Sequence, residues 1–336
     1  MRLAALLALL LRCRGYNVTR RLGAADGVAF GAAAAGQAPP ERPTSVAPIG
    51  ASPKAIVLFT HLRRCGGTYL EDAVLKPHAK RLNLPEPLLC REGELARHHR
   101  LTEATLHKYR DLLSRTPLVW RHCPFGVHEL LGNARPYVYV TMVRKPAQRM
   151  VSWFAYCDKY SKDKCHTGPF ARAEPRPGWS RLRAFYSARR DKYASESPRS
   201  KAASQLGTFH PNWLEYSLDD NYQTRMLCGG EAHDADVPLA PSAADCAVHN
   251  LKYQYAFVGL LERRDASLCV LKHMLGLEMR HDPNKDDKRG PTTHSDGAIE
   301  NDFSESFASY FALDNAVYAE AGNVLDAHLE RFPQCR

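Results

Sequence analysis

One segment of the chain places arginines and a Gly-Gly pair directly after an apolar run. In FTHLRRCGGTYLEDAVL, residues 59–75, an amphipathic helix pattern follows the glycines. Backbone N–H groups at a helix N-terminus attract anions, and glycine lets a ligand approach the backbone closely. The segment therefore predicts an anion-binding turn. Its residues are Arg63, Arg64, Cys65, Gly66, Gly67 and Thr68.

An alternative interpretation of this turn needs no ligand. Thr68 and Glu71 have the spacing of a capping box, in which two side chains satisfy the first N–H groups of a helix. The turn lacks the Gly-Lys-Ser/Thr of nucleotide kinases, and the chain has no Gly-x-Gly-x-x-Gly motif. A P-loop nucleotide kinase is therefore disfavoured as a function.

A second segment, VRKPAQRMVSWF (residues 143–154), repeats the arrangement. Arg144 ends an apolar run, Pro146 suits the first turn of a helix, and Ser152 follows eight residues after Arg144. A side chain at a strand end and one farther along the next helix could reach the same phosphate, so Arg144 and Ser152 are predicted to share one. Two such turns predict a ligand with two phosphate groups.

Strand and helix patterns alternate around these turns. The predicted strands are short continuous apolar runs at 54–59, 136–143 and 255–260. The predicted helices are 69–75, 103–114, 146–157, 221–227, 266–277 and 303–332. This alternation predicts an α/β fold: a single domain with a mainly parallel central sheet flanked by helices.

The N-terminal part has the composition of targeting and linker sequence. Residues 1–22 contain the apolar run Leu3–Leu11, which is too short to cross a bilayer and fits a signal peptide or short signal anchor. The alternative is a plastid or mitochondrial transit peptide, because arginines precede any abundance of acidic residues. Residues 23–53 are rich in Ala, Gly and Pro and predict a linker or stem, so the folded domain should span 54–336.

The charge balance favours an anionic partner. The chain has 46 Lys and Arg against 36 Asp and Glu, a formal net charge of +10, and a basic surface attracts nucleotides, polyanionic glycans, nucleic acids or membranes. Residues 158–201 form a basic insertion with interspersed aromatic residues. It could line an acceptor groove, or it could be a solvated insertion.

Ten cysteines are compatible with an oxidising secretory compartment. Two pairs are close enough in sequence to be predicted as disulfides across a polar loop: Cys157 with Cys165, and Cys228 with Cys246. Three others are expected to be small buried apolar residues: Cys65, Cys123 and Cys269.

Taken in order, these motifs resemble the sulfotransferases that use 3′-phosphoadenosine 5′-phosphosulfate (PAPS), in particular the carbohydrate branch related to heparan sulfate 2-O-sulfotransferases. The resemblance also includes RHCPFGVHELL, NYQTRMLCGG, YAFVGLLERRDASLCVLKHMLGL and ALDNAVYAEA, and it covers most of residues 54–332. Arg64 stands where the family has lysine, and Lys145 where it commonly has aspartate.

The resemblance implies a P-loop-like sulfotransferase fold and a set of residue roles. The first turn, residues 63–68, would bind the 5′-phosphosulfate of the donor, and Arg144 with Ser152 would bind the 3′-phosphate. Arg64 would stabilise the leaving phosphate. His122, in RHCPFGVHELL, would be the general base that takes a proton from the acceptor hydroxyl, with His128 as the alternative.

The resemblance also implies a substrate class and a compartment. The acceptor would be a glycan or polysaccharide, and no metal or nucleic acid would be needed. The protein would work in the Golgi lumen or elsewhere in the secretory pathway, where its N-terminus could attach it to the membrane. A plastid location is the alternative. The alternative function is a noncatalytic polyanion- or glycan-binding protein that retains the fold.

Overall fold

The computed structural model describes residues 56–81, 116–131, 136–160, 221–233, 239–276 and 311–336, with a few isolated positions between them. The predicted targeting segment 1–22, the linker 23–53, most of the basic insertion 158–201 and Cys165 lie outside this part of the chain. Among the described residues, no helix has both the length and the apolar character that crossing a membrane requires.

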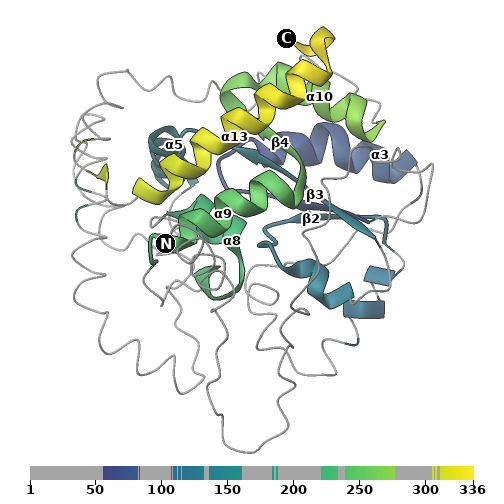
Figure 1. Cartoon of the computed structure of the whole chain (residues 1–336), viewed down its shortest axis with the longest axis horizontal. Helices are drawn as coiled ribbons and strands as arrows, with labels where there is room; N and C mark the ends of the chain where they lie inside the picture. Colours follow the sequence, from purple (N-terminus) through teal and green to yellow (C-terminus); the bar gives the residue numbers. More distant parts are fainter. Residues whose placement is uncertain are drawn as a thin grey trace, which may run out of the picture.

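A four-stranded parallel sheet forms the centre of the fold (Figure 1). Its strands are β1 (Ile56–Thr60), β2 (Leu118–Arg121), β3 (Tyr137–Val143) and β4 (Tyr255–Leu260), in the order β2-β1-β3-β4. Side chains of β1 and β4 are buried throughout, which explains the continuous apolar runs of their sequences. The predicted α/β class and parallel sheet are confirmed. The sequence prediction did not include β2, a strand of four residues.

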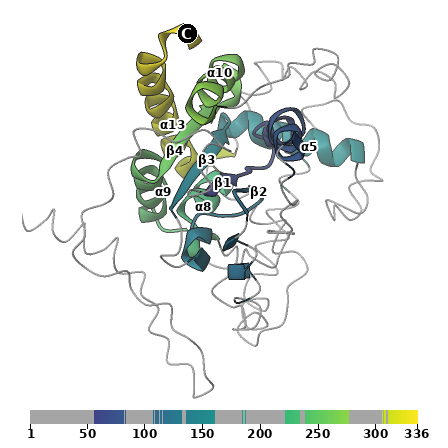
Figure 2. The same cartoon turned by 90° about the vertical axis from the view of Figure 1, so that its right-hand side faces the viewer.

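Helices follow or precede each strand and cover the sheet. After β1 come α2 (Gly67–Leu70), a π-helical turn η1 (Glu71–Leu75) and α3 (Lys76–Arg81); α5 (Pro146–Tyr160) follows β3. The remaining helices are α8 (Tyr222–Cys228), α9 (Ser242–Tyr253), α10 (Arg264–Leu275) and α13 (Ala312–Arg331). Short 3-10 turns are η3 (Val127–Leu131), η5 (Gly230–His233), η6 (Leu261–Arg263) and η8 (Pro333–Cys335). α9 and α13 lie side by side and both contact β4 (Figures 1 and 2).

Helices α8 and α13 cap each other with buried side chains. Asp314, in the first turn of α13, accepts hydrogen bonds from the backbone N–H groups of Gln223 and Thr224 and from the Thr224 hydroxyl, at 3.3, 2.7 and 2.8 Å. Asn221, the residue before α8, accepts from the backbone N–H groups of Leu313 and Asp314. This exchange satisfies first-turn donors of both helices. It therefore fixes α8, which lies beside the candidate site described below.

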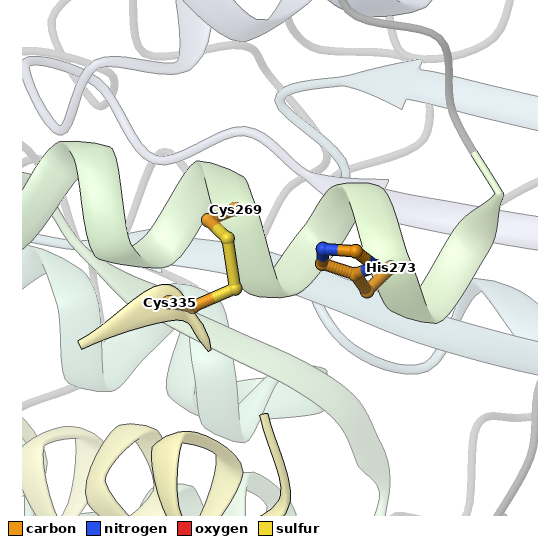
Figure 3. Close-up of side chains that lie close together, drawn as sticks. All are labelled: Cys269, His273 and Cys335. Carbon is orange, nitrogen blue, oxygen red and sulfur yellow. A yellow bond between two sulfur atoms is a disulfide. The ribbon is translucent and has the colours of Figure 1, made fainter. Parts of the chain in front are cut away.

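Disulfides tie the C-terminal half together. The predicted bond Cys228–Cys246 is present, and Cys65 is buried and free, as expected. Two expectations were wrong: Cys123 is disulfide-bonded, and Cys269 on α10 is bonded to Cys335 in η8 (Figure 3). Sequence spacing could not indicate the second bond, because 66 residues separate its cysteines.

The Cys269–Cys335 disulfide lies beside an imidazole. His273 is one helical turn farther along α10 (Figure 3), and its ligand atom lies within 4.8 Å of both sulfur atoms. Because the two sulfurs are bonded to each other, neither is a thiolate in this state. The three residues therefore offer a metal ion only the imidazole nitrogen of His273 while the disulfide is intact.

Candidate functional site

The two predicted anion-binding turns lie next to each other at the carboxyl edge of the sheet. One follows β1 and the other follows β3, and these strands pair directly. The order β2-β1-β3-β4 places β2 on one side of β1 and β3 on the other. In open parallel sheets, ligands bind outside the carboxyl ends of the strands at such a switch point. Both turns therefore occupy the position where this architecture places a ligand.

Arg64 connects the two turns. Its Nε and Nη2 donate to Ser152 Oγ on α5 at 3.1 and 3.0 Å, and its guanidinium carbon lies 5.1 Å from the centre of the Tyr156 ring. Arg144 Nη1 in turn donates to the backbone oxygen of Arg64 at 3.1 Å. Ser152, which was predicted to share a phosphate with Arg144, is thus in contact with Arg64, and three predicted ligand residues form one connected group.

The backbone of the first turn has a left-handed conformation at two positions. Arg64 has φ 67° and Gly66 has φ 81°. Gly66 is the N-cap of α2, and no side chain caps this helix. The capping-box interpretation is therefore wrong: Thr68 lies inside the helix and is exposed, and the Glu71 carboxylate contacts His61 instead of a backbone N–H. The first N–H groups of a helix have no partner within it, so this N-terminus keeps its anion-attracting character.

Two different constraints favour glycine in this turn: the left-handed backbone at Gly66 and close packing at Gly67. A Cβ at Gly66 would lie 2.7 Å from Leu261 Cδ1, at the end of β4. A Cβ at Gly67 would lie 2.0 Å from Cδ2 and 2.4 Å from Nε2 of His61. The turn is therefore packed between residues that follow β1 and β4, and Gly67 has no room for a side chain.

An acidic residue after β4 sets the position of the second turn. Glu262 Oε1 accepts a hydrogen bond from the backbone N–H of Lys145 at 2.9 Å and lies 4.0 Å from Nε of Arg144. Its other oxygen accepts from the hydroxyl of Tyr318 on α13 at 3.3 Å. The Arg144 side chain is 9% exposed. Its guanidinium therefore lies between groups that follow the two strands neighbouring β3, Arg64 after β1 and Glu262 after β4.

Gln223 on α8 forms hydrogen bonds with both turns. Its amide donates to the backbone oxygen of Arg144 at 2.9 Å and accepts from the Arg144 N–H at 3.0 Å. The same amide oxygen accepts from the Cys65 thiol at 3.4 Å. Burial raises the pKa of Cys65 to about 12, and its backbone N–H donates to Leu62. The thiol and the backbone N–H of Cys65 thus bond within the protein, which gives this predicted ligand a structural role in the turn.

Tyr222 on α8 supports the first arginine of the turn. Its hydroxyl accepts from the Arg63 N–H at 3.3 Å, and the buried guanidinium of Arg149 lies 5.0 Å from its ring centre. Burial raises the pKa of Tyr222 to about 12, against the lowering effect of the Arg63 charge. A neutral phenol therefore sits between two arginines, where a cation–π contact is favourable.

The predicted base, His122, directly follows β2 at the same edge of the sheet. Its Nδ1 lies 2.7 Å from the backbone oxygen of His61. The two imidazole rings lie 4.4 Å apart between centres, and His61 Nδ1 lies 2.7 Å from Glu71 Oε1. β2 pairs with β1, so His122 and the two predicted anion-binding turns follow three adjacent strands.

His128, the alternative base, lies elsewhere. Its ring stacks on Tyr137 at 4.5 Å between centres, and its Nδ1 lies 3.0 Å from the Tyr139 hydroxyl. Both tyrosines belong to the amino-terminal half of β3, whereas Arg144 follows the carboxyl end of that strand. The geometry thus separates His128 from the two turns and favours His122.

Several residues of the site were not singled out from the sequence as site residues. They are His61, Glu71, Tyr222, Gln223 and Glu262. His61 lies within the first motif, two residues before Arg63, so its position next to the turn was visible in the sequence. Gln223 was not recognisable as a site residue, because its contacts with the second turn join positions 79 residues apart.

The comparisons with known proteins identify no family. No family model matches the chain, and the comparison with curated proteins found no significant match. Function therefore has to be inferred from the residues and geometry of the site.

Proposed function

We propose that the chain is a sulfotransferase with a P-loop-like sulfotransferase fold that transfers a sulfuryl group from PAPS to a hydroxyl of a carbohydrate acceptor. One observation carries the proposal: the two anion-binding turns follow adjacent parallel strands, and Arg64, Ser152 and Arg144 connect them. A donor with two phosphate groups on one nucleoside matches two such turns. The uncapped N-terminus of α2 supplies N–H groups for one phosphate, and Arg144 with Ser152 supplies donors for the other.

The hydrogen bond of His122 defines its basic nitrogen. The His61 backbone oxygen can only accept, so His122 Nδ1 carries the proton in this bond. In the neutral imidazole, Nε2 then holds the lone pair. This tautomer suits a general base, which would accept the proton of the attacking hydroxyl at Nε2.

Arg64 supplies charge where negative charge develops. PAPS contributes the sulfuryl group, and its transfer leaves negative charge on the departing phosphate oxygen. A guanidinium stays charged at neutral pH and therefore stabilises that charge electrostatically, without donating its proton. The hydrogen bond to Ser152 holds the Arg64 guanidinium between the two turns.

A noncatalytic polyanion-binding protein remains the second candidate. One observation favours it: the Arg64 guanidinium is hydrogen-bonded to Ser152 and lies over Tyr156. A guanidinium held in this way would bind an anion without assisting the transfer of a sulfuryl group. The two candidates predict the same affinity for the donor product and differ only in transfer.

The test is a binding and transfer experiment with five proteins. Adenosine 3′,5′-bisphosphate at about a hundred times its dissociation constant should stabilise the wild type by about 2.7 kcal/mol, measured by a melting shift. Arg144→Ala should reduce this shift more than Ser152→Ala, because charge-assisted hydrogen bonds are stronger than neutral ones. Lys252→Ala is the matched control: it removes an exposed positive charge from the end of α9, before the amino end of β4.

Transfer of radiolabelled sulfate from PAPS to a panel of glycans separates the two candidates. His122→Ala should lower transfer by about a hundred- to ten-thousandfold, the usual contribution of a general base, while leaving the bisphosphate affinity nearly unchanged. Absence of a melting shift at millimolar bisphosphate would contradict both candidates. A shift without transfer to any acceptor would favour the polyanion-binding protein.

A further inference from the structure

We propose that His61 is a positioning residue that sets the distance between the anion-binding turn and the base His122. The proposal rests on the proposed function and concerns how the same site is built. His61 directly follows β1 and is 5% exposed, so it acts through its neighbours and does not touch the substrates.

The imidazole of His61 separates the two functional parts. On one side, it lies so close to Gly67 that a Cβ there would overlap three of its ring atoms, at 2.0, 2.4 and 2.7 Å. It also lies 4.4 Å from the His122 ring, at an interplanar angle of 37°. The orientation of the His61 ring therefore defines how far the base lies from the first residue of α2.

A second contact holds the ring in place. Glu71 Oε1 lies 2.7 Å from His61 Nδ1, and both residues are buried, at 8% and 5% exposure. Phe59 stacks on the same ring at 5.7 Å, with an angle of 14°. Glu71 lies in the π-helical turn η1, and such turns often mark functional positions in helices. The helix that carries the anion-binding turn thus also fixes the orientation of His61.

The backbone of His61 adds a third link. Its carbonyl oxygen accepts the Nδ1–H of His122 at 2.7 Å, which selects the tautomer with a basic Nε2. His61 therefore contacts the anion-binding turn, the base His122 and the Glu71 carboxylate, which orients the His61 ring. For stability alone, an apolar pair of the same volume would serve as well as a buried His–Glu pair. The polar pair is better explained by the fixed geometry that it gives to His122.

The experiment separates positioning from simple stability. In the double variant His61→Phe/Glu71→Met, both polar partners are replaced by apolar groups of similar size, so folding stability should stay close to that of the wild type. The bisphosphate dissociation constant should stay within about threefold, whereas kcat should fall at least tenfold with little change in KM. In a second pair, Glu71→Gln, which keeps an acceptor for His61 Nδ1, should recover most of the kcat that Glu71→Ala loses.

Asp72→Ala is the matched control, since it removes the next carboxylate along the helix, which pairs with Lys76 at the surface. It should keep the wild-type kcat. Suppose that the wild type binds bisphosphate and transfers sulfate. If the double variant or Glu71→Ala then transfers sulfate at the wild-type kcat, the positioning role is overturned and the proposed function stands. If the double variant does not fold, the Glu71 pair alone decides. If the wild type neither binds nor transfers, the proposed function fails, and the positioning role fails with it.

Discussion

Replacing Gly67 by alanine tests the packing of the anion-binding turn. The new Cβ would lie 2.0 Å from Cδ2, 2.4 Å from Nε2 and 2.7 Å from Cγ of His61. Real Cβ contacts are essentially never shorter than 3.0 Å, and the ring cannot easily retreat, because Glu71 and Phe59 hold it. Gly67→Ala therefore has to move the ring or the turn.

The magnitude is the difference between two opposing effects. Overpacking a buried position costs about 1–3 kcal/mol, and three close contacts with a held ring place Gly67→Ala near the upper limit. Alanine in a helix gains about 1 kcal/mol over glycine. The net loss should be about 2 kcal/mol, which corresponds to about 4–8 °C in melting temperature at about 2–4 °C per kcal/mol for a domain of this size.

Urea denaturation followed by circular dichroism measures this loss, with Gly322→Ala as the matched control. Gly322 lies inside α13, and a Cβ there meets no atom within 4 Å, so this variant should be stabilised by about 0.5–1 kcal/mol. In Gly67→Ala/His61→Ala the clash of about 3 kcal/mol is relieved while the helix gain of alanine remains, so the double variant should be about 3 kcal/mol more stable than the sum of the single effects. Gly67→Ala as stable as Gly322→Ala would refute the packing described here.

Two further predictions concern buried titratable groups. Burial raises the pKa of Asp314 above its ordinary value of 3.8, against the charge of Arg149 and the hydrogen bonds from Thr224 and Gln223. The folded state then binds the carboxyl proton of Asp314 more tightly than the unfolded state does. The stability of the wild type relative to Asp314→Asn should therefore fall as pH rises from 3.8 through the raised pKa. Urea titrations at several pH values measure this difference in stability, and a difference that rises with pH would contradict the prediction. Because burial raises the pKa of Cys65 to about 12, iodoacetamide at pH about 8 should label Cys65 only after unfolding, and mass spectrometry showing its rapid labelling in the native protein would contradict this.

The sequence was informative wherever a local pattern sufficed. The buried strands β1, β3 and β4 were predicted because parallel strands covered on both faces need continuous apolar runs. β2 has only four residues and was missed for that reason. α9 was also missed, although Ala243, Ala247 and Leu251 are buried at helical spacing, because alanine gives a weak apolar signal.

In the candidate site, too, the sequence predicted the features that local patterns mark. Arginines, glycines and a serine after β1 and β3 mark the two predicted anion-binding turns, because phosphate recognition needs those residue types close together in sequence. The sequence also placed His122 in the segment before β3. It predicted the Cys228–Cys246 disulfide from a short separation of 18 residues.

Only the tertiary structure decided which side chains meet. The Arg64–Ser152 bond joins residues 88 positions apart, and the Gln223 bridge to the second turn joins residues 79 apart. Glu71 has the spacing of a capping residue, yet it binds His61, because the ring of His61 lies in the buried space beside Gly67. Sequence spacing specifies contacts within a helix or turn, whereas contacts between strand ends depend on strand order and register, which this chain's local patterns do not encode.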